Sequence, residues 1–258
     1  PFAKINGIDL YYEVTGPKAG TAPAIVFAHG TAGNRLSWWQ QVPHFRDRFT
    51  CVTFDHRGWG RSIDAPDGPL GAMFAADLQA LLDHLGLERV SLVAQSMGGW
   101  TCLQFASRRP ERVERLAMLA THGGIATPEI NDAWRISRGL MEALPEGVHP
   151  AAGERMYHEQ PELHFLYTEI AAINPERAPG DGVRSAGAST PEDAARVTAP
   201  VLFVTGEEDI VIPPRMIELA APMFRDARVE RLPRTGHSAY FERAATVNAV
   251  LDRFLAHP

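Results

Sequence analysis

The stretch that decides the fold is Val90-Ser-Leu-Val-Ala-Gln-Ser-Met-Gly-Gly99. Its first five residues are mostly apolar, as in a buried strand, and the residues up to 108 follow with a helical pattern. Ser96 lies at the turn between the two, where the strained backbone directs the hydroxyl out of the sheet. Small residues at 94, 98 and 99 suit such a turn because it brings backbone segments close together. The pattern therefore predicts an exposed serine hydroxyl at a strand-to-helix turn.

Similar strand and helix patterns lie on both sides of this stretch. Asn6-Gly7 predicts a two-residue hairpin between strands at 2–5 and 8–14. Further strands are predicted at 24–28, 50–54, 90–94, 113–120, 201–205 and 228–232, and helices at 36–47, 70–85, 97–108, 215–223 and 240–256. Apolar strands that alternate with helices indicate an α/β fold with a mostly parallel, eight-stranded sheet flanked by helices.

The alternation stops between residues 122 and 199, a segment rich in proline, glycine and alanine. Helices are predicted there at 129–144, 162–173 and 191–197, and no strand. We therefore expect a core formed by 1–121 and 200–258, which holds the chemistry, and a helical lid, 122–199, which selects the substrate. One apolar and aromatic set in the lid is expected partly to pack it and partly to cover Ser96: Trp134, Met141, Tyr157, Phe165 and Tyr167.

Composition excludes several classes of protein. The chain has 258 residues with 45% hydrophobic and 22% charged residues, which is the balance of a globular protein. A net charge of −6 without a basic run argues against nucleic acid as a partner. The sequence shows neither an apolar run long enough to span a membrane nor a signal segment, so we expect a cytoplasmic protein. Its two cysteines, Cys51 and Cys102, lie in apolar segments and argue against a disulfide scaffold.

A serine hydroxyl needs a base, and the base needs an acid. His237, between the last predicted strand and the last helix, is the candidate base for Ser96. Asp209 is the candidate acid, although Glu207 and Glu208 lie nearer the end of the preceding strand. An acid would fix the imidazole tautomer and stabilise its charged form. The chain order is nucleophile, acid, base.

Together these stretches resemble the α/β-hydrolase superfamily, most closely its bacterial esterases, enol-lactonases and cofactor-free haloperoxidases. The resemblance covers the whole chain and rests on the Ser96 turn and four other stretches: His29-Gly30, Asp55 to Ser62, Gly206 to Asp209, and Gly236-His237. It implies Ser96, Asp209 and His237 as a catalytic triad and the backbone N–H groups of Thr31 and Met97 as an oxyanion hole. Ala94 stands where the family usually has glycine.

Other residues are assigned to support or to the pocket. His29 is expected to hold the oxyanion loop by a side-chain hydrogen bond, and Asp55 and Arg57 to form a pair that fixes their loop. Candidate substrate-binding residues are Trp38, Trp100, His122, Trp134 and Val211. We expect no metal and no cofactor, and the sequence leaves a homodimer open.

The resulting hypothesis is a serine hydrolase that cleaves a small, largely apolar carboxylic ester or lactone through an acyl-enzyme on Ser96. One alternative is hydrolysis of a C–C bond beside a ketone, and another is perhydrolase or haloperoxidase-like chemistry on the same triad. A ligand-binding receptor that retains the triad is a third alternative. The sequence does not decide which substrate is used.

Overall fold

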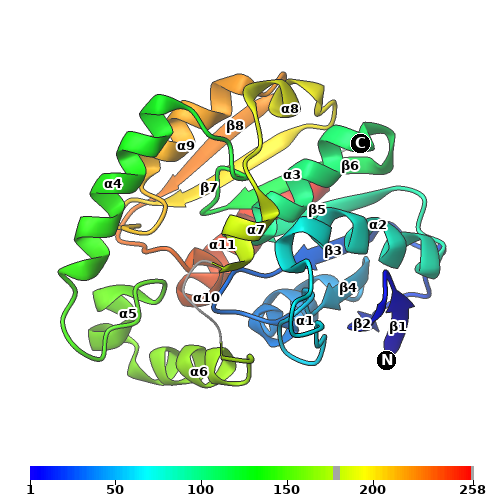
Figure 1. Cartoon of the computed structure of the whole chain (residues 1–258), viewed down its shortest axis with the longest axis horizontal. Coiled ribbons are helices and arrows are strands. Elements are labelled where there is room, and N and C mark those ends of the chain that lie inside the picture. Colours follow the sequence, from blue (N-terminus) through cyan, green and yellow to red (C-terminus); the bar gives the residue numbers. More distant parts are fainter. Residues whose placement is uncertain (177–180, 257–258) are drawn as a thin grey trace.

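The computed structural model describes residues 1–176 and 181–256 and shows a single eight-stranded sheet with helices on both faces (Figure 1). The strands are β1 (Phe2–Ile5), β2 (Ile8–Thr15), β3 (Ala24–Ala28), β4 (Thr50–Phe54), β5 (Val90–Gln95), β6 (Val113–Leu119), β7 (Val201–Gly206) and β8 (Ala227–Leu232). Their order in the sheet is β1-β2-β4-β3-β5-β6-β7-β8. The pairs β1/β2 and β2/β4 are antiparallel, and every later pair is parallel. The predicted fold class is confirmed.

Local sequence explains the edge and the centre of this sheet. Asn6 and Gly7 have φ values of 45° and 85°, the left-handed conformation that a tight hairpin of type I′ requires. β3, β4, β5 and β7 are buried at every position, which explains why they read as unbroken apolar runs rather than alternating ones.

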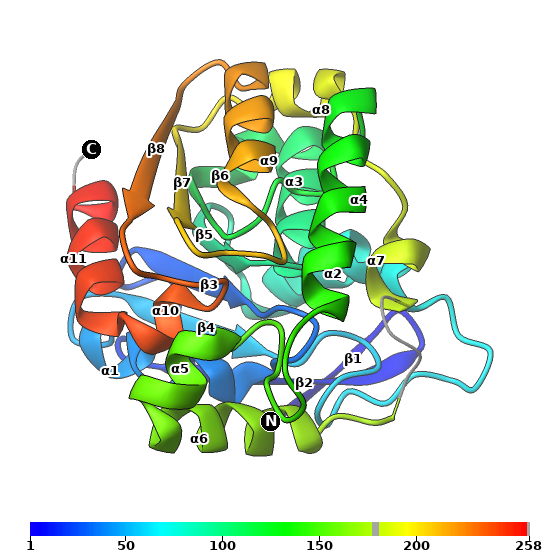
Figure 2. The same cartoon turned by 90° about the vertical axis from the view of Figure 1, so that its left-hand side faces the viewer.

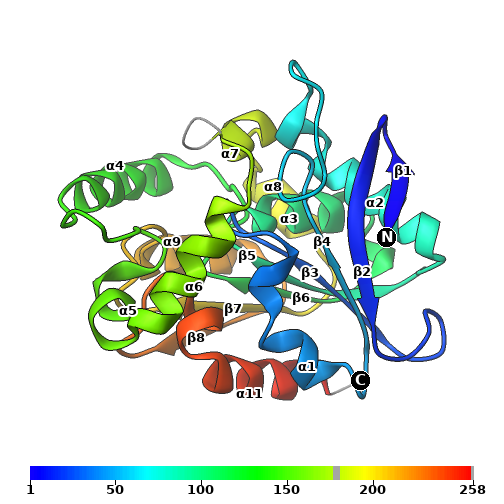
Figure 3. The ribbon, with the colours of Figure 1, turned by 90° about the horizontal axis from the view of Figure 1, so that it is seen from below.

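Two hydrophobic cores lie on opposite faces of the sheet. One face carries α1 (Gln41–Phe45), α10 (Ala239–Glu242) and α11 (Ala244–Leu255), which pack with Phe27 and Trp38. The other carries α2 (Phe74–Leu85), α3 (Gly98–Arg108), α8 (Pro191–Arg196) and α9 (Pro214–Ala220). Figure 3 shows α1 and α11 together on one side of the strands and α2 and α3 on the other.

Two predicted helices are each interrupted by residues outside any helix, whereas those at 70–85 and 215–223 each combine an α-helix with an adjoining 3₁₀ turn. The predicted helix at 36–47 is a short 3₁₀ helix, Arg35–Trp38, followed by α1. A continuous α-helix would place Pro43 in its interior, where proline has no N–H to donate and its ring clashes with the preceding turn. The predicted helix at 240–256 is divided into α10 and α11 at Arg243, whose φ of −127° lies outside the helical range.

The segment between β6 and β7 is helical, and its described part contributes no strand to the sheet. It contains α4 (Pro128–Glu142), α5 (Gly153–Glu159), α6 (Pro161–Ala172), α7 (Asp181–Ala186) and α8. The helices α4, α6 and α8 match the prediction within two residues, whereas α5 and α7 were not predicted. Figure 2 shows α5 and α6 beside α10, away from the layer of α2 and α3, whereas α8 packs against α3. Within the described ranges, no helix combines the length and apolar composition needed to cross a bilayer.

Candidate active site

Ser96 occupies a sharp turn between β5 and α3. Its φ of 49° is in the left-handed region, which costs free energy for any residue with a Cβ atom. The two glycines that follow permit close packing: a Cβ on Gly98 would lie 2.1 Å from the carbonyl oxygen of Ala28, and one on Gly99 would lie 2.2 Å from Thr121 Oγ1. The predicted elbow geometry is therefore present, and the small residue Ala94 fits at its fully buried position.

His237 and Asp209 form a buried pair. The two atoms His237 Nδ1 and Asp209 Oδ2 are 2.9 Å apart, and the other carboxylate oxygen accepts the backbone N–H groups of Val211 and Ile212, each at 2.8 Å. These three contacts fix the carboxylate, which then favours a proton on Nδ1 of the imidazole. Nε2 is consequently free to act as a proton acceptor.

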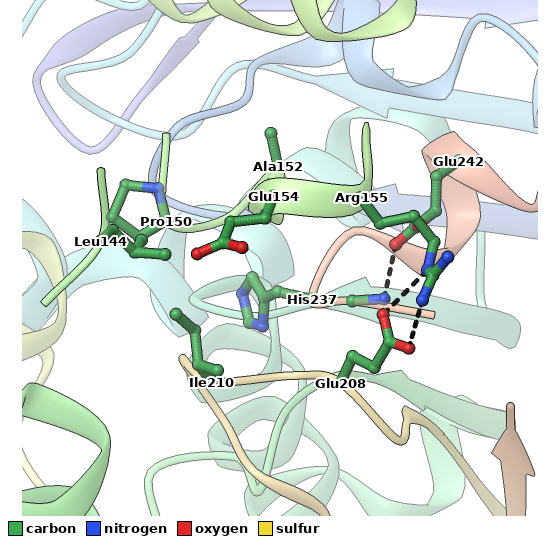
Figure 4. Close-up of a pocket in the computed structure, with 11 residues that line it drawn as sticks. Leu144, Pro150, Ala152, Glu154, Arg155, Glu208, Ile210, His237 and Glu242 are labelled. Atoms are coloured by element: carbon green, nitrogen blue, oxygen red, sulfur yellow. Dashed lines mark hydrogen bonds and ion pairs between the residues drawn. The ribbon is translucent and has the colours of Figure 1, made fainter. Parts of the chain in front are cut away.

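The two neighbouring acids have other surroundings. Glu207 and Glu208 are exposed, whereas Asp209 is buried. Arg155 of α5 contacts both carboxylate oxygens of Glu208, at 2.8 and 2.5 Å (Figure 4). Its hydrogen bond lowers the pKa of Glu208. Of the three acids, it is Asp209 that pairs with His237.

The loop after β3 is held by several hydrogen bonds. His29 Nδ1 donates to the carbonyl oxygen of Gly30 at 2.8 Å, and its Nε2 accepts the N–H of His56 at 2.9 Å. Burial lowers the pKa of His29 to about 4, so the ring is neutral at pH 7. Trp59 Nε1 donates to the carbonyl oxygen of Thr31 at 2.7 Å. Hydrogen bonds to its backbone therefore hold the loop that carries Thr31. One of them comes from the side chain of His29, as the sequence predicts.

Asp55 and Arg57 do not form the expected pair with each other. Arg57 instead pairs with Asp77 at 2.8 Å and with Asp64 at 3.1 Å, and all three side chains are buried. Asp55 accepts the Arg35 guanidinium at 3.1 Å and the backbone N–H of Arg35 at 2.8 Å. Both residues still fix loops, but Asp77 and Arg35 each lie 20 residues from their partner, so spacing gave no sign of these two pairings.

A cavity of about 690 Å³ opens over the elbow. Ser96 and His237 line it together with Thr31, from the loop after β3. Three of the predicted substrate-binding residues also line it: Trp100, Trp134 and Val211. Asp209 lies behind His237, and Met97 is fully buried at the start of α3. The first backbone amides of a helix have no acceptor within the helix, so they are available to an anion.

Two other candidates lie outside the lining of this cavity. Trp38 is fully buried and packs against Phe27 and Tyr240, with ring centroids 5.1 and 4.8 Å apart. His122 is buried beside Trp100 and Trp134, at centroid distances of 5.0 and 5.9 Å. Trp38 therefore belongs to the core under the sheet, and His122 supports two cavity residues from behind.

The segment between β6 and β7 contributes cavity residues that the sequence did not single out, and Trp59 adds another from outside that segment. Among the lid aromatics, Trp134 and Tyr167 face the cavity, as does Met141, whereas Phe165 is 66% exposed. Unforeseen lining residues include Trp59, His149 and Asn174. Trp59 lies within the Asp55–Ser62 stretch that carries the resemblance, so the sequence could have indicated that it lies near the site. His149 and Asn174 precede and follow helices in a segment without a recognisable motif.

The segment between β6 and β7 is also attached to the loop that carries His237. Ser238 Oγ donates to the carbonyl oxygen of Ala151 at 2.6 Å. Glu242 accepts the N–H of Gly236 at 2.7 Å, and its own carbonyl oxygen accepts Gln160 Nε2 at 3.2 Å. Figure 4 shows Glu242 and the Arg155–Glu208 pair on the same side of His237, around a second cavity of about 260 Å³.

Comparison with known proteins agrees with this geometry. The family described as alpha/beta hydrolase fold matches residues 23–170, and one described as TAP-like protein matches residues 181–258. A 2-hydroxy-6-oxononadienedioate/2-hydroxy-6-oxononatrienedioate hydrolase of Paraburkholderia xenovorans is 26% identical over 97% of this chain and 91% of its own length.

Two solved structures share the whole fold. The enol-lactonase of Burkholderia xenovorans is 26% identical with a TM-score of 0.79, and each chain is covered completely. An N-acyl homoserine lactone degrading enzyme, Est816, is 27% identical with a TM-score of 0.79 over 98% of this chain and 100% of the other. With its sheet order, its serine elbow and a family match across more than half of its length, the chain belongs to the α/β-hydrolase family of enzymes.

Proposed function

We propose that this enzyme is a serine hydrolase of small, largely apolar and uncharged carboxylic esters or lactones. The observation that carries the proposal is the composition of the 690 Å³ cavity above Ser96. Its wall is mainly aromatic and aliphatic, as binding sites for apolar ligands are. Among its described lining residues none is lysine or arginine, whereas two are acids, Glu176 and Asp181.

Each side chain has a defined task in the proposed reaction. His237 Nε2 takes the proton of the Ser96 hydroxyl as Ser96 Oγ attacks the carbonyl carbon, while Asp209 stabilises the imidazolium. The oxyanion is bound by the backbone N–H groups of Thr31 and Met97, and one such donor contributes about 3 kcal/mol. His237 then protonates the leaving alkoxide, and a water deprotonated by His237 releases the acid from Ser96.

Charge distinguishes this proposal from its C–C hydrolase alternative. The name of the Paraburkholderia relative specifies a dioate substrate, which carries two carboxylates. The described lining offers no lysine or arginine to such a dianion, and of its two acids Asp181 is already paired with Arg184. Opposite charge is what stabilises a carboxylate in a site with little water. The described lining therefore favours an uncharged substrate.

The test is hydrolysis of short p-nitrophenyl esters by the wild type and by Ser96→Ala. We expect the variant to lose about 10⁴-fold or more in kcat, because the covalent step is removed. Undiminished turnover by Ser96→Ala would refute the acyl-enzyme. Adding hydrogen peroxide to the wild type and measuring peracid tests the perhydrolase alternative on the same acyl-enzyme.

A further inference from the structure

His149 brings a second imidazole to the cavity that holds Ser96 and His237. It lies in the lid between α4 and α5, and it lines this cavity together with those two residues. Its Nδ1 accepts the backbone N–H of Ala151 at 3.1 Å. A ring nitrogen that accepts a hydrogen bond carries no proton, so the proton of a neutral His149 is on Nε2.

Burial keeps this imidazole neutral. Together with the nearby imidazoles of His164 and His237, it lowers the pKa of His149 to about 4. The ring also packs edge-to-face against Tyr167, with centroids 5.3 Å apart. The tautomer and the ring position are thus both fixed, and Nε2–H is a permanent hydrogen-bond donor in the wall of the cavity.

Two other polar side chains of the same wall, those of Trp59 and Asn174, are already engaged. Trp59 Nε1 donates to the carbonyl oxygen of Thr31. Asn174 accepts the N–H of Gly60 at 3.1 Å and donates to the carbonyl oxygen of Gly33 at 3.1 Å, so both ends of its amide serve the neighbouring loops. No described residue accepts a hydrogen bond from His149 Nε2. A donor without a protein acceptor at a ligand cavity is suited to a ligand oxygen.

We propose that His149 is a specificity-determining residue whose Nε2–H donates a hydrogen bond to an acceptor oxygen in the alcohol part of the substrate. The proposal rests on the serine hydrolase function above. The alcohol part is indicated because His149 and His237 line the same cavity, and Ala151, which donates to His149, also accepts Ser238 Oγ. Ser238 follows His237, the group that protonates the leaving oxygen. The preferred substrate is therefore an ester or lactone whose alcohol part carries an ether, carbonyl or amide oxygen.

Three butanoate esters with alcohol chains of equal length test this proposal: pentyl, 2-ethoxyethyl and 3-methoxypropyl. Each of the last two has an oxygen where the first has a methylene. All three give the same acyl-enzyme, so a difference in kcat/KM arises in binding and acylation. Release of butanoic acid is followed by titration for the wild type, His149→Phe, His149→Gln and a cavity control without a donor, Met141→Leu.

We expect the wild type to prefer at least one ether ester over the pentyl ester, after correction for their alkaline hydrolysis rates. His149→Phe should reduce that preference about tenfold, whereas His149→Gln, whose amide also donates, and Met141→Leu should retain it. Equal ratios for the wild type and His149→Phe with both ether esters would overturn the proposal. Failure of the proposed function is seen separately, as undiminished hydrolysis of all three esters by Ser96→Ala.

Discussion

Replacing Glu242 tests how burial of a carboxyl group beside His237 affects the stability of the protein. Its carboxylate is buried at the end of α10 and accepts the N–H of Gly236, the residue before His237, at 2.7 Å. Replacement by glutamine keeps an oxygen that can accept the same N–H but removes the titrating group. Glu242→Gln therefore isolates the free energy of ionising a buried carboxyl group.

The structure fixes both the size and the sign of the effect. Burial raises the pKa of Glu242 to about 7 from an ordinary value of 4.5, and the Gly236 amide opposes part of that rise. Between these pH values the folded state holds a proton that the unfolded state has released, so stability falls as the pH rises. The cost is absent below pH 4.5, is complete above pH 7, and reaches about 3 kcal/mol.

The assay is urea unfolding of the wild type and Glu242→Gln at several pH values between 4.5 and 8. The free energy of unfolding of the variant, relative to the wild type, should increase by up to about 3 kcal/mol across this range. Other titrating groups are common to both proteins and cancel in the difference. The exposed Glu146→Gln should show no such trend. Parallel curves for Glu242→Gln and the wild type would refute the reasoning.

Three further predictions concern the elbow and its partners. Asp209→Asn should lower kcat on p-nitrophenyl butanoate by about 10⁴-fold with an unchanged circular dichroism spectrum, because the amide favours the wrong tautomer of His237; a loss below tenfold would contradict this. Ser96→Gly should abolish turnover while raising the free energy of unfolding by about 1 kcal/mol, since glycine tolerates the positive φ; a destabilised variant would contradict it. Gly30→Ala should lower both activity and melting temperature, because the new Cβ would lie 2.0 Å from Gln95 Oε1 and 3.0 Å from Ser96 Cβ; wild-type activity would argue against that packing.

The strands of the sheet could be predicted because each is encoded by neighbouring residues in the sequence. Unbroken apolar runs mark strands that are buried on both faces, and Asn6-Gly7 encodes a hairpin by backbone conformation alone. Helix boundaries were harder to predict where one residue interrupts an otherwise helical pattern. The first predicted helix is broken between Trp38 and Gln41, which places Pro43 in the first turn of α1, and the last is broken at Arg243.

Pairings across the chain were not predictable in the same way. Three consecutive acids follow β7, and residue type and spacing alone do not say which of them faces His237; the family resemblance pointed to Asp209. In the structure, Asp209 turns inward to the imidazole, whereas Glu208 contacts Arg155, which is 53 residues away. Arg57 likewise forms an ion pair with Asp77, which only the fold brings close to it, whereas spacing suggested Asp55. Residue type limits the candidates, and only the packed fold chooses among them.

The segment 122–199, which the sequence predicts to be a lid, also holds the loops around Ser96. Asn174 holds the carbonyl oxygen of Gly33 in the loop that carries Thr31. Ala151 accepts Ser238 Oγ beside His237, and Arg155 binds Glu208 beside Asp209. Each of the three loops that bring these groups to Ser96 is therefore bonded to the lid. Because small displacements of the proposed catalytic groups would be costly, we expect a displacement of this segment to alter kcat as well as KM.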